Sequence, residues 1–441
     1  MAVQSQTIPA SGEQSAAKPK AVAKADKHIW GIFIALCIIS TIELYSASSR
    51  EVQASNVFGP LLRHGMMLLL GIGITVGLSR LKFKWLYSLT PVFVVFALVV
   101  AVYVLFKGQI INGARRSMSL FGIALQSAEL LKLAVVLFIA RIIAVTRERE
   151  GVTTGGVMAC AAFVLLCGGL LFSQGLTNTI LLMGISMSMM LIGGVQLKKF
   201  ALVLVAYGVI AGCGMIYKAR NAETAADETT MIAETGKDAQ GNRKTMERTG
   251  TWRGRLDRWA ADTVPKYDQP ITAINRQEMY SYMAQANGSW FGVLPGNSRE
   301  TARLPLAFSD YIYAIIVEDW GFAGGFCLLF LYLCLLGRAG AIASRCSRAF
   351  PALLVMGMAV MIVLQALFHM AIVTGVFPVS GQPLPLISKG GSSIIVTSIA
   401  FGIMLSVSRF AAQTNRNRDV RAEIAELPAE LTAENILARH Q

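Results

Sequence analysis

A carboxylate stands directly before one of the long apolar runs of the sequence. Ser309-Asp310-Tyr311 opens this run, and Glu318 and Asp319 follow about two helical turns deeper. A carboxylate at a partly desolvated membrane mouth suits a general base. A Ser or Asp before an apolar run is also typical of a helix N-cap. Position alone therefore predicts either a base or a cap at Asp310.

Two neighbouring arginines, Arg115 and Arg116, end the segment NGARR at residues 112–116. Guanidinium groups bind phosphate by bidentate hydrogen bonds, so this pair could hold a phosphorylated ligand. Anchoring to lipid headgroups is a serious alternative. Further along, Glu129 and Lys132 stand three residues apart and share one helix face, which predicts a structural ion pair inside the membrane.

A third segment, residues 375–393, is dense in Pro and Gly, which break helices. Irregular backbone at membrane depth survives only where it is buried in protein or lines a wet cavity. We therefore predict a cavity wall beside a re-entrant loop. A plain hairpin turn is the alternative, but residues 389–393 continue past any turn that is needed. Residues 292–298 form a turn-rich approach to Asp310, for which an ordinary loop is an adequate explanation.

Composition indicates that membrane spans position these segments. Hydrophobic residues make up 54% of the chain and charged residues only 15%, too few for a water-soluble surface of this size. The net charge of +14 lies mostly in short gaps between apolar runs, which indicates membrane topology and anionic lipid rather than nucleic acid. Ten runs can span a bilayer: 29–47, 60–78, 85–106, 127–146, 156–172, 176–195, 200–217, 310–336, 351–377 and 387–407.

The short loops between these runs predict the orientation. Basic residues gather in alternate loops, so the positive-inside rule places both termini in the cytoplasm. The fold class is thus an all-α polytopic membrane protein of about ten helices, with one large extracytoplasmic loop between helices 7 and 8. The predicted parts are a cytoplasmic tail at 1–28, helices 1–7 at 29–217, the large loop at 218–309, helices 8–10 at 310–409 and a cytoplasmic tail at 410–441.

Within the large loop, residues 251–259 mix Trp with Arg, which favours a segment lying in the headgroup layer over an ordinary turn of surface helix. The chain has no phosphate-binding P-loop, HExxH motif or dinucleotide fingerprint.

Taken together and in this order, the motifs resemble the SEDS family (shape, elongation, division and sporulation), and its FtsW branch more than its RodA branch. The similarity spans roughly residues 29–409, with the large loop in the family's position. It is carried by NGARR with QSAELLK (112–116 and 126–132), SDYIYA (309–314), GNS (296–298) and GQPLPLISKGGSS (381–393).

The chain departs from the family pattern at several positions. Ser117 stands where the family usually has Trp, and Ala128 lies in a stretch that lacks the family's Pro. The family's PDLGT motif becomes QGLTN at 174–178, so Gly175 replaces its acidic residue. Lys389 replaces a usual Tyr. These changes put in doubt any role carried over to positions 117 and 175.

The resemblance implies a peptidoglycan glycosyltransferase that polymerises lipid II, an undecaprenyl-pyrophosphate disaccharide-peptide, by inverting glycosyl transfer. Asp310 would be the catalytic base, and the substrate-binding residues would be Arg115, Arg116, Lys389, Ser392 and Asn297. Glu318 and Asp319 form an acidic pair in helix 8. No organic cofactor is implied, the metal ligands are unknown, and a divalent cation such as Mg²⁺ is considered beside the arginines.

The family works with a class B penicillin-binding protein transpeptidase, so the resemblance implies that partner together with other divisome proteins, lipid II and membrane lipids, and no nucleic acid. It also implies the cytoplasmic (inner) membrane, with enrichment at the division site for septal synthesis; an elongation role stays open. The alternatives are a lipid II flippase or transporter and a non-catalytic division scaffold. The outer position of Asp310 favours the enzyme over a transporter, which would need critical charges near the midplane.

Overall fold

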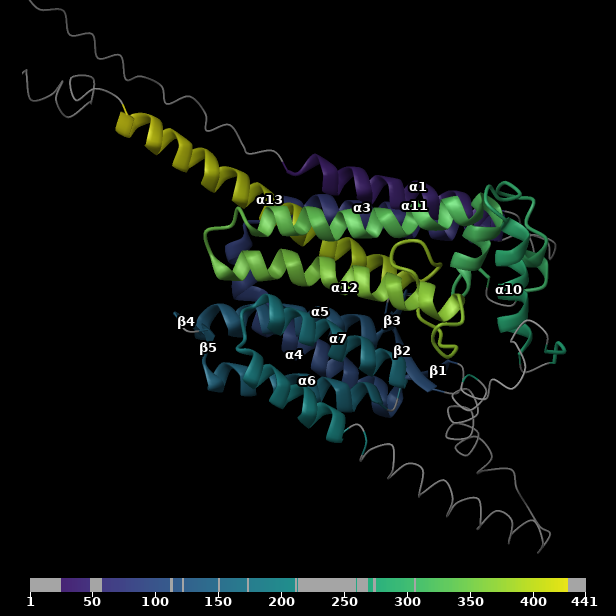
Figure 1. Ribbon diagram of the computed structural model, residues 1–441, viewed down its shortest axis with the longest axis horizontal. Helices are drawn as coiled ribbons and strands as arrows, with labels where there is room; N and C mark the ends of the chain where they lie inside the picture. Colours follow the sequence, from purple (N-terminus) through teal and green to yellow (C-terminus); the bar gives the residue numbers. More distant parts are fainter. Residues whose placement is uncertain are drawn as a thin grey trace, which may run out of the picture.

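Long apolar runs become long helices in the computed structural model (Figure 1). The structure describes residues 25–47, 58–111, 114–120, 123–149, 151–172, 174–210, 212, 259, 269–272, 275–304 and 307–426. The helices are α1 (Lys27–Ala47), α3 (Phe58–Arg80), α4 (Phe83–Lys107), α5 (Ser127–Thr146), α6 (Thr154–Phe172), α7 (Leu176–Ile192), a stretch at 197–210, α10 (Arg276–Gly288), α11 (Ile312–Ala343), α12 (Ala349–Val373) and α13 (Gly391–Glu426).

Seven helices within the described ranges are long and apolar enough to cross a membrane: α1, α3, α4, α6, α11, α12 and α13. Three further elements occupy the other predicted positions. The helix α7 is apolar but shorter, residues 197–210 are helical, and α5 runs for 20 residues but carries Glu129, Lys132 and Arg141. The prediction of an all-helical polytopic membrane protein is therefore confirmed.

Two predicted spans were placed too close together. The ninth was predicted to end at 377 and the tenth to begin at 387, whereas α12 ends at Val373 and α13 begins at Gly391. Gly375 has a φ of +82°, a left-handed conformation that ends the helix, and prolines follow it. The non-helical segment between α12 and α13 is thus longer than expected, and Figure 1 shows it turning back along the bundle beside α12.

The loop at 107–126 contains strands that the sequence analysis did not predict. An antiparallel sheet is built from β1 (Gln109–Ile111), β2 (Ala114–Leu120) and β3 (Ile123–Gln126), in that order. A second, smaller hairpin pairs β4 (Arg147–Glu148) with β5 (Gly151–Val152). In Figure 1 the two sheets lie at opposite ends of the bundle, and α10 lies at the same end as β1 to β3.

The start of α1 is fastened to two later helices. The Asp26 carboxylate accepts hydrogen bonds from Arg338 of α11 at 2.9 and 2.5 Å, and the Asp26 backbone N–H donates to Ser408 of α13 at 3.1 Å. Burial would raise the pKa of Asp26, but the bonds from Arg338 and from nearby backbone N–H groups hold it below its usual value. The N-terminal end of α1 and the late part of α13 therefore share one end of the bundle, as the predicted topology requires.

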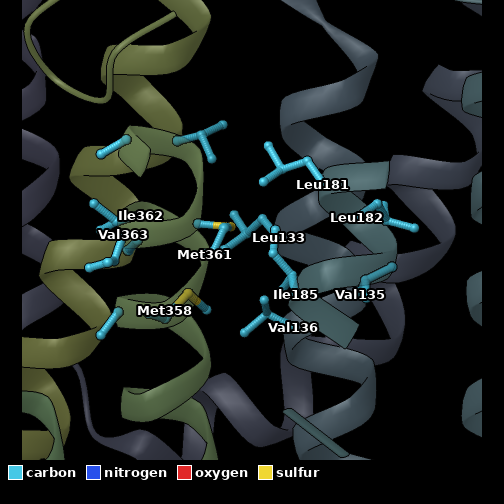
Figure 2. Packing of buried hydrophobic residues seen from close by; sticks show 14 of the residues in the cluster. Leu133, Val135, Val136, Leu181, Leu182, Ile185, Met358, Met361, Ile362 and Val363 are labelled. Carbon is cyan, nitrogen blue, oxygen red and sulfur yellow. The ribbon is translucent and has the colours of Figure 1, made fainter. Parts of the chain in front are cut away.

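Apolar side chains of α5, α7 and α12 form the centre of the bundle (Figure 2). Met358 and Met361 of α12 point toward Leu133 of α5 and Ile185 of α7. All four are almost fully buried. Because lipid tails are as apolar as these side chains, close van der Waals packing rather than water exclusion holds such helices together.

Gly321 interrupts α11 with a φ of +72° and a ψ of −176°. The backbone groups released by this break are met by the loop that follows α10. Phe322 N donates to Ser289 O at 2.8 Å, and Leu294 N donates to Asp319 O at 2.9 Å. A Cβ at 321 would lie 2.3 Å from Trp290 O, so only glycine fits.

Replacing Gly321 by Ala should destabilise the fold, because the new methyl group meets backbone that cannot move aside. We expect a loss of about 2–4 kcal/mol, in the range for strained backbone combined with overpacking. Thermal unfolding in detergent measures the loss. Gly337→Ala in the same helix is the matched control, since a Cβ there meets nothing within 4 Å. Equal melting temperatures for the two variants would contradict this role of Gly321.

Candidate functional site

The segment between α12 and α13 has carbonyl groups that no helix can satisfy. Four of them accept hydrogen bonds from side chains of the surrounding helices instead. The pairs are His369 Nδ1 with Gln382 O (2.6 Å), Gln365 Nε2 with Pro383 O (3.2 Å), Tyr332 OH with Pro385 O (2.7 Å) and Ser40 Oγ with Ile387 O (3.2 Å). Helices α12, α11 and α1 thus hold this re-entrant segment in one conformation.

Asp310 lies against the re-entrant segment. A Cβ added to Gly381 would be 2.9 Å from Asp310 Oδ2, so the carboxylate packs on the glycine backbone. Its other oxygen, Oδ1, accepts a hydrogen bond from Ser309 Oγ at 2.9 Å. Asp310 is partly exposed, and Tyr311, not Asp310, occupies the N-cap position of α11 without a side-chain cap bond. The cap interpretation of Asp310 is therefore wrong.

The segment before α11 and the end of the re-entrant segment are fastened to each other. Ser388 Oγ donates to Ser309 O at 2.7 Å, and Lys389 N donates to Phe308 O at 2.9 Å. The Lys389 ammonium lies 4.3 Å from the centre of the Phe308 ring, a cation–π contact. It also acts electrostatically on His64 of α3. A cation thus contacts Phe308, two residues before Asp310 in the sequence.

A buried ion pair, Glu129 with Lys132, supports the re-entrant segment through Gln365. Lys132 Nζ donates to Glu129 Oε1 at 2.8 Å and to Gln365 Oε1 at 2.6 Å. Gln365 in turn donates to Glu129 Oε1 at 3.3 Å and to Pro383 O, so three helix-borne side chains close a ring beside the re-entrant segment. Lys132 is fully buried and Glu129 nearly so. This pair is a support, out of reach of a solvent-borne substrate.

Arg116 lies near the start of α7, where the family's acidic residue is replaced by glycine. A Cβ at Gly175 would be 3.9 Å from Arg116 Nη2. In the first turn of α7, Asn178 Oδ1 accepts from Gln382 Nε2 at 2.9 Å, and Gln382 is the neighbour of Gly381. Arg116 therefore lies near the turn of α7 that bonds to Gln382, and Asp310 packs on the neighbouring Gly381.

Other predicted site residues are distributed differently. The side chain of Arg115 and residues 112–113 lie outside the described part of the chain, as do residues 251–258 of the predicted interfacial segment. Trp259 of that segment donates from Nε1 to Gly375 O at 3.1 Å. Ser392 is buried in the first turn of α13. Asn297 is exposed, and its Nδ2 donates to Val293 O at 3.1 Å within its own loop, with no contact to Asp310 among the interactions found.

Glu318 and Asp319 have different partners. The Glu318 carboxylate accepts from the backbone N–H groups of Arg299 and Glu300 at 3.0 and 3.3 Å, and from the Ser298 hydroxyl. Glu318 therefore anchors the loop that precedes Asp310. The charge of Asp319 instead acts on Glu43 of α1.

Sequence reasoning missed the side chains that hold the re-entrant segment. Ser40, Tyr332 and Gln365 are polar residues inside apolar helices, and each is buried. A polar group at such a position needs a partner, so its presence was a usable signal. Its partner lies up to 347 residues away in the chain, and no local pattern identifies it.

Comparisons with known proteins agree with this architecture. The model of a family of cell cycle proteins, FtsW/RodA/SpoVE, matches residues 26–242 and 258–413. A probable peptidoglycan glycosyltransferase FtsW of Polynucleobacter necessarius subsp. necessarius (strain STIR1) is 29% identical over 393 residues, which cover 86% of this chain and 84% of the relative. The corresponding protein of Halomonas elongata is 28% identical over 402 residues, covering 88% and 91% of the two chains.

Solved structures share the fold. One comes from work on the structural coordination of polymerization and crosslinking by a peptidoglycan synthase complex, with a TM-score of 0.64, 24% identity and coverage of 88% of this chain and 99% of that one. The rod shape determining protein RodA of Thermus thermophilus gives a TM-score of 0.59 and 22% identity, covering 89% and 98%. At these identities the likeness shows the arrangement of the helices.

Breaking the buried ion pair should cost far more than removing an exposed charge. We expect Lys132→Met to lose about 3–5 kcal/mol of stability, because Glu129 is left as an uncompensated buried charge. Glu129→Gln/Lys132→Met should recover part of this loss, since no charge is stranded. Unfolding in detergent measures both, and Lys84→Met at the exposed start of α4 is the control. A double variant no more stable than Lys132→Met would refute this account.

Proposed function

Since the chain belongs to the FtsW/RodA/SpoVE (SEDS) family of cell cycle proteins, we propose that it is a peptidoglycan glycosyltransferase that polymerises lipid II into glycan strands. The observation that carries the proposal is the position of Asp310. Its carboxylate is partly exposed, lies against Gly381, and is supported by bonds between its own segment and the re-entrant segment. The tail of a lipid-linked sugar lies in the membrane, and its sugar lies at the surface. Asp310, which is partly exposed directly before α11, suits a reaction at that surface.

The proposed reaction is a single displacement. Asp310 accepts the proton of the acceptor's GlcNAc 4-hydroxyl while that oxygen attacks the anomeric carbon of the donor. The bond from that carbon to the pyrophosphate oxygen breaks, the configuration inverts, and undecaprenyl pyrophosphate leaves. Arg116, with Arg115 beside it in sequence, stabilises the charge on the departing pyrophosphate. Lys389 adds a second cation near Asp310.

A divalent cation is part of the proposal only as a companion of the substrate. No group of three or more His, Cys, Asp or Glu side chains in the described ranges gathers to hold a metal ion. A Mg²⁺ ion would therefore be held mainly by the substrate's pyrophosphate and by water, beside Arg116. It would neutralise charge on the leaving group.

We further propose septal synthesis in the cytoplasmic membrane at the division site as the cellular role. The relatives at 28–29% identity carry the FtsW name, which supports division over elongation. A class B penicillin-binding protein transpeptidase is the proposed partner, within the larger set of divisome proteins. One solved structure of similar fold comes from work on polymerization and crosslinking by a peptidoglycan synthase complex, which supports a cross-linking partner.

Replacing Asp310 by Ala should abolish polymerisation, because general base catalysis contributes roughly 100- to 10,000-fold. Purified protein with lipid II, with and without a partner transpeptidase, provides the assay, and polymer length is measured on gels. Glu278→Gln in the first turn of α10 is the control acid and should retain activity. Full activity of Asp310→Ala would refute the assignment. Movement of lipid II between leaflets without polymer, in the unmodified protein, would favour a flippase.

Gly381→Ala should impair the same reaction without unfolding the protein. The new methyl group would lie 2.9 Å from Asp310 Oδ2 and push the carboxylate aside. A displacement of this kind is expected to lower the rate roughly 10- to 100-fold. Gly390→Ala in the same segment is the matched control, since its Cβ makes an ordinary contact of 3.6 Å with Ser393. Equal rates for the two variants would show that the packing of Gly381 on Asp310 is unimportant.

A further inference from the structure

Two carboxylates meet inside the outer half of the bundle, away from Asp310. Glu43 lies one turn before the end of α1, and Asp319 lies just before the break in α11. Both side chains are completely buried. Glu43 Oε1 accepts a hydrogen bond from the indole of Trp320, the neighbour of Asp319, at 2.6 Å, and the charge of Asp319 acts on Glu43. The two acids therefore share one site between α1 and α11.

Most of the oxygen atoms in this site have no hydrogen-bond donor. Within the described part of the chain, Glu43 Oε2 and both Asp319 oxygens are buried and without a hydrogen bond. The ion pairs found there include neither residue. The charge that acts on Asp319 is that of Glu318, which is also acidic and already accepts several N–H and O–H groups. Nothing among these contacts balances the two negative charges.

A buried carboxylate without a counter-charge is too costly to persist, so this site must hold either a proton or a cation. A single shared proton would leave one of the two negative charges unbalanced. A cation would contact all three oxygen atoms, and a divalent cation would balance both charges. Hard oxygen ligands of this kind are those preferred by Mg²⁺, Ca²⁺ and Mn²⁺.

We propose that Glu43 and Asp319 bind a divalent cation. Ser46, one turn after Glu43, lies near Asp319 and would add a neutral oxygen, and water would complete the coordination. The Ser46 hydroxyl also accepts the Gly296 N–H at 3.0 Å. The ion therefore joins α1, the break in α11 and the loop at 288–298. This site is separate from any cation that accompanies the substrate's pyrophosphate, and it does not depend on the proposed enzyme activity.

Mn²⁺ provides the direct test. The full chain is purified in detergent and treated with a chelator, and Mn²⁺ binding is followed by the loss of the free-ion paramagnetic resonance signal. We expect one saturable site in the unmodified protein and a rise in melting temperature on addition of Mn²⁺. In Asp319→Asn and in Glu43→Gln, which keep the shape but remove one charge, binding should weaken at least 10-fold. Glu300→Gln in the same region and Asp310→Asn should bind Mn²⁺ as the unmodified protein does.

Several outcomes would overturn the proposal. One is the absence of saturable Mn²⁺ binding to the chelator-treated, folded, unmodified chain. Another is undiminished binding in both Asp319→Asn and Glu43→Gln. Loss of binding in Asp310→Asn alone would move the ion to the proposed catalytic residue. If a single variant does not fold, Glu43→Gln/Asp319→Asn decides, because its melting temperature should no longer respond to Mn²⁺. A melting temperature of the unmodified protein that depends on pH but not on Mn²⁺ would identify a shared proton instead.

Discussion

The arrangement of the candidate site depends on one constraint: backbone that leaves helical geometry inside a membrane bundle must still be hydrogen-bonded. The segment between α12 and α13 meets this constraint with side chains from three helices, which contact carbonyls from Gln382 to Ile387. Because the carbonyls are held by three different helices, the segment cannot shift without moving several partners. Asp310 packs on Gly381 of this segment, so the helices that hold the segment also determine where the Asp310 carboxylate lies.

The break in α11 answers the same constraint in a second way. There the partner is backbone, since the loop after α10 donates to and accepts from the groups around Gly321. Backbone can approach backbone this closely only where side chains are missing, which explains glycine at 288, 292 and 321. The loop is fixed further by Glu318, which accepts N–H groups of residues 299 and 300. The loop that precedes Asp310 is therefore bonded to α11 at two places, the backbone around Gly321 and the carboxylate of Glu318.

The sequence could predict what local chemistry determines. Apolar length placed the spans, the spacing of three placed Glu129 and Lys132 on one face, and Pro and Gly density marked the re-entrant segment. It could not predict contacts whose partners lie far apart in the chain, such as Ser40 with Ile387. Nor could it separate Glu318 from Asp319, which are adjacent but point to different neighbours. The positive φ of Gly321 was hidden for a similar reason, because it depends on a loop from outside α11.

The buried acids within the described ranges have three kinds of partner, and these partners indicate different roles. Glu129 is balanced by Lys132 and held by Gln365, which suits a fixed support. Glu318 is satisfied by N–H and O–H donors, which suits an anchor for a loop. Three oxygen atoms of Glu43 and Asp319 receive neither kind of partner, which is the basis of the cation site proposed above. Asp310 differs from all of these because it is partly exposed, and an acid that must accept a proton from an arriving hydroxyl has to be reachable.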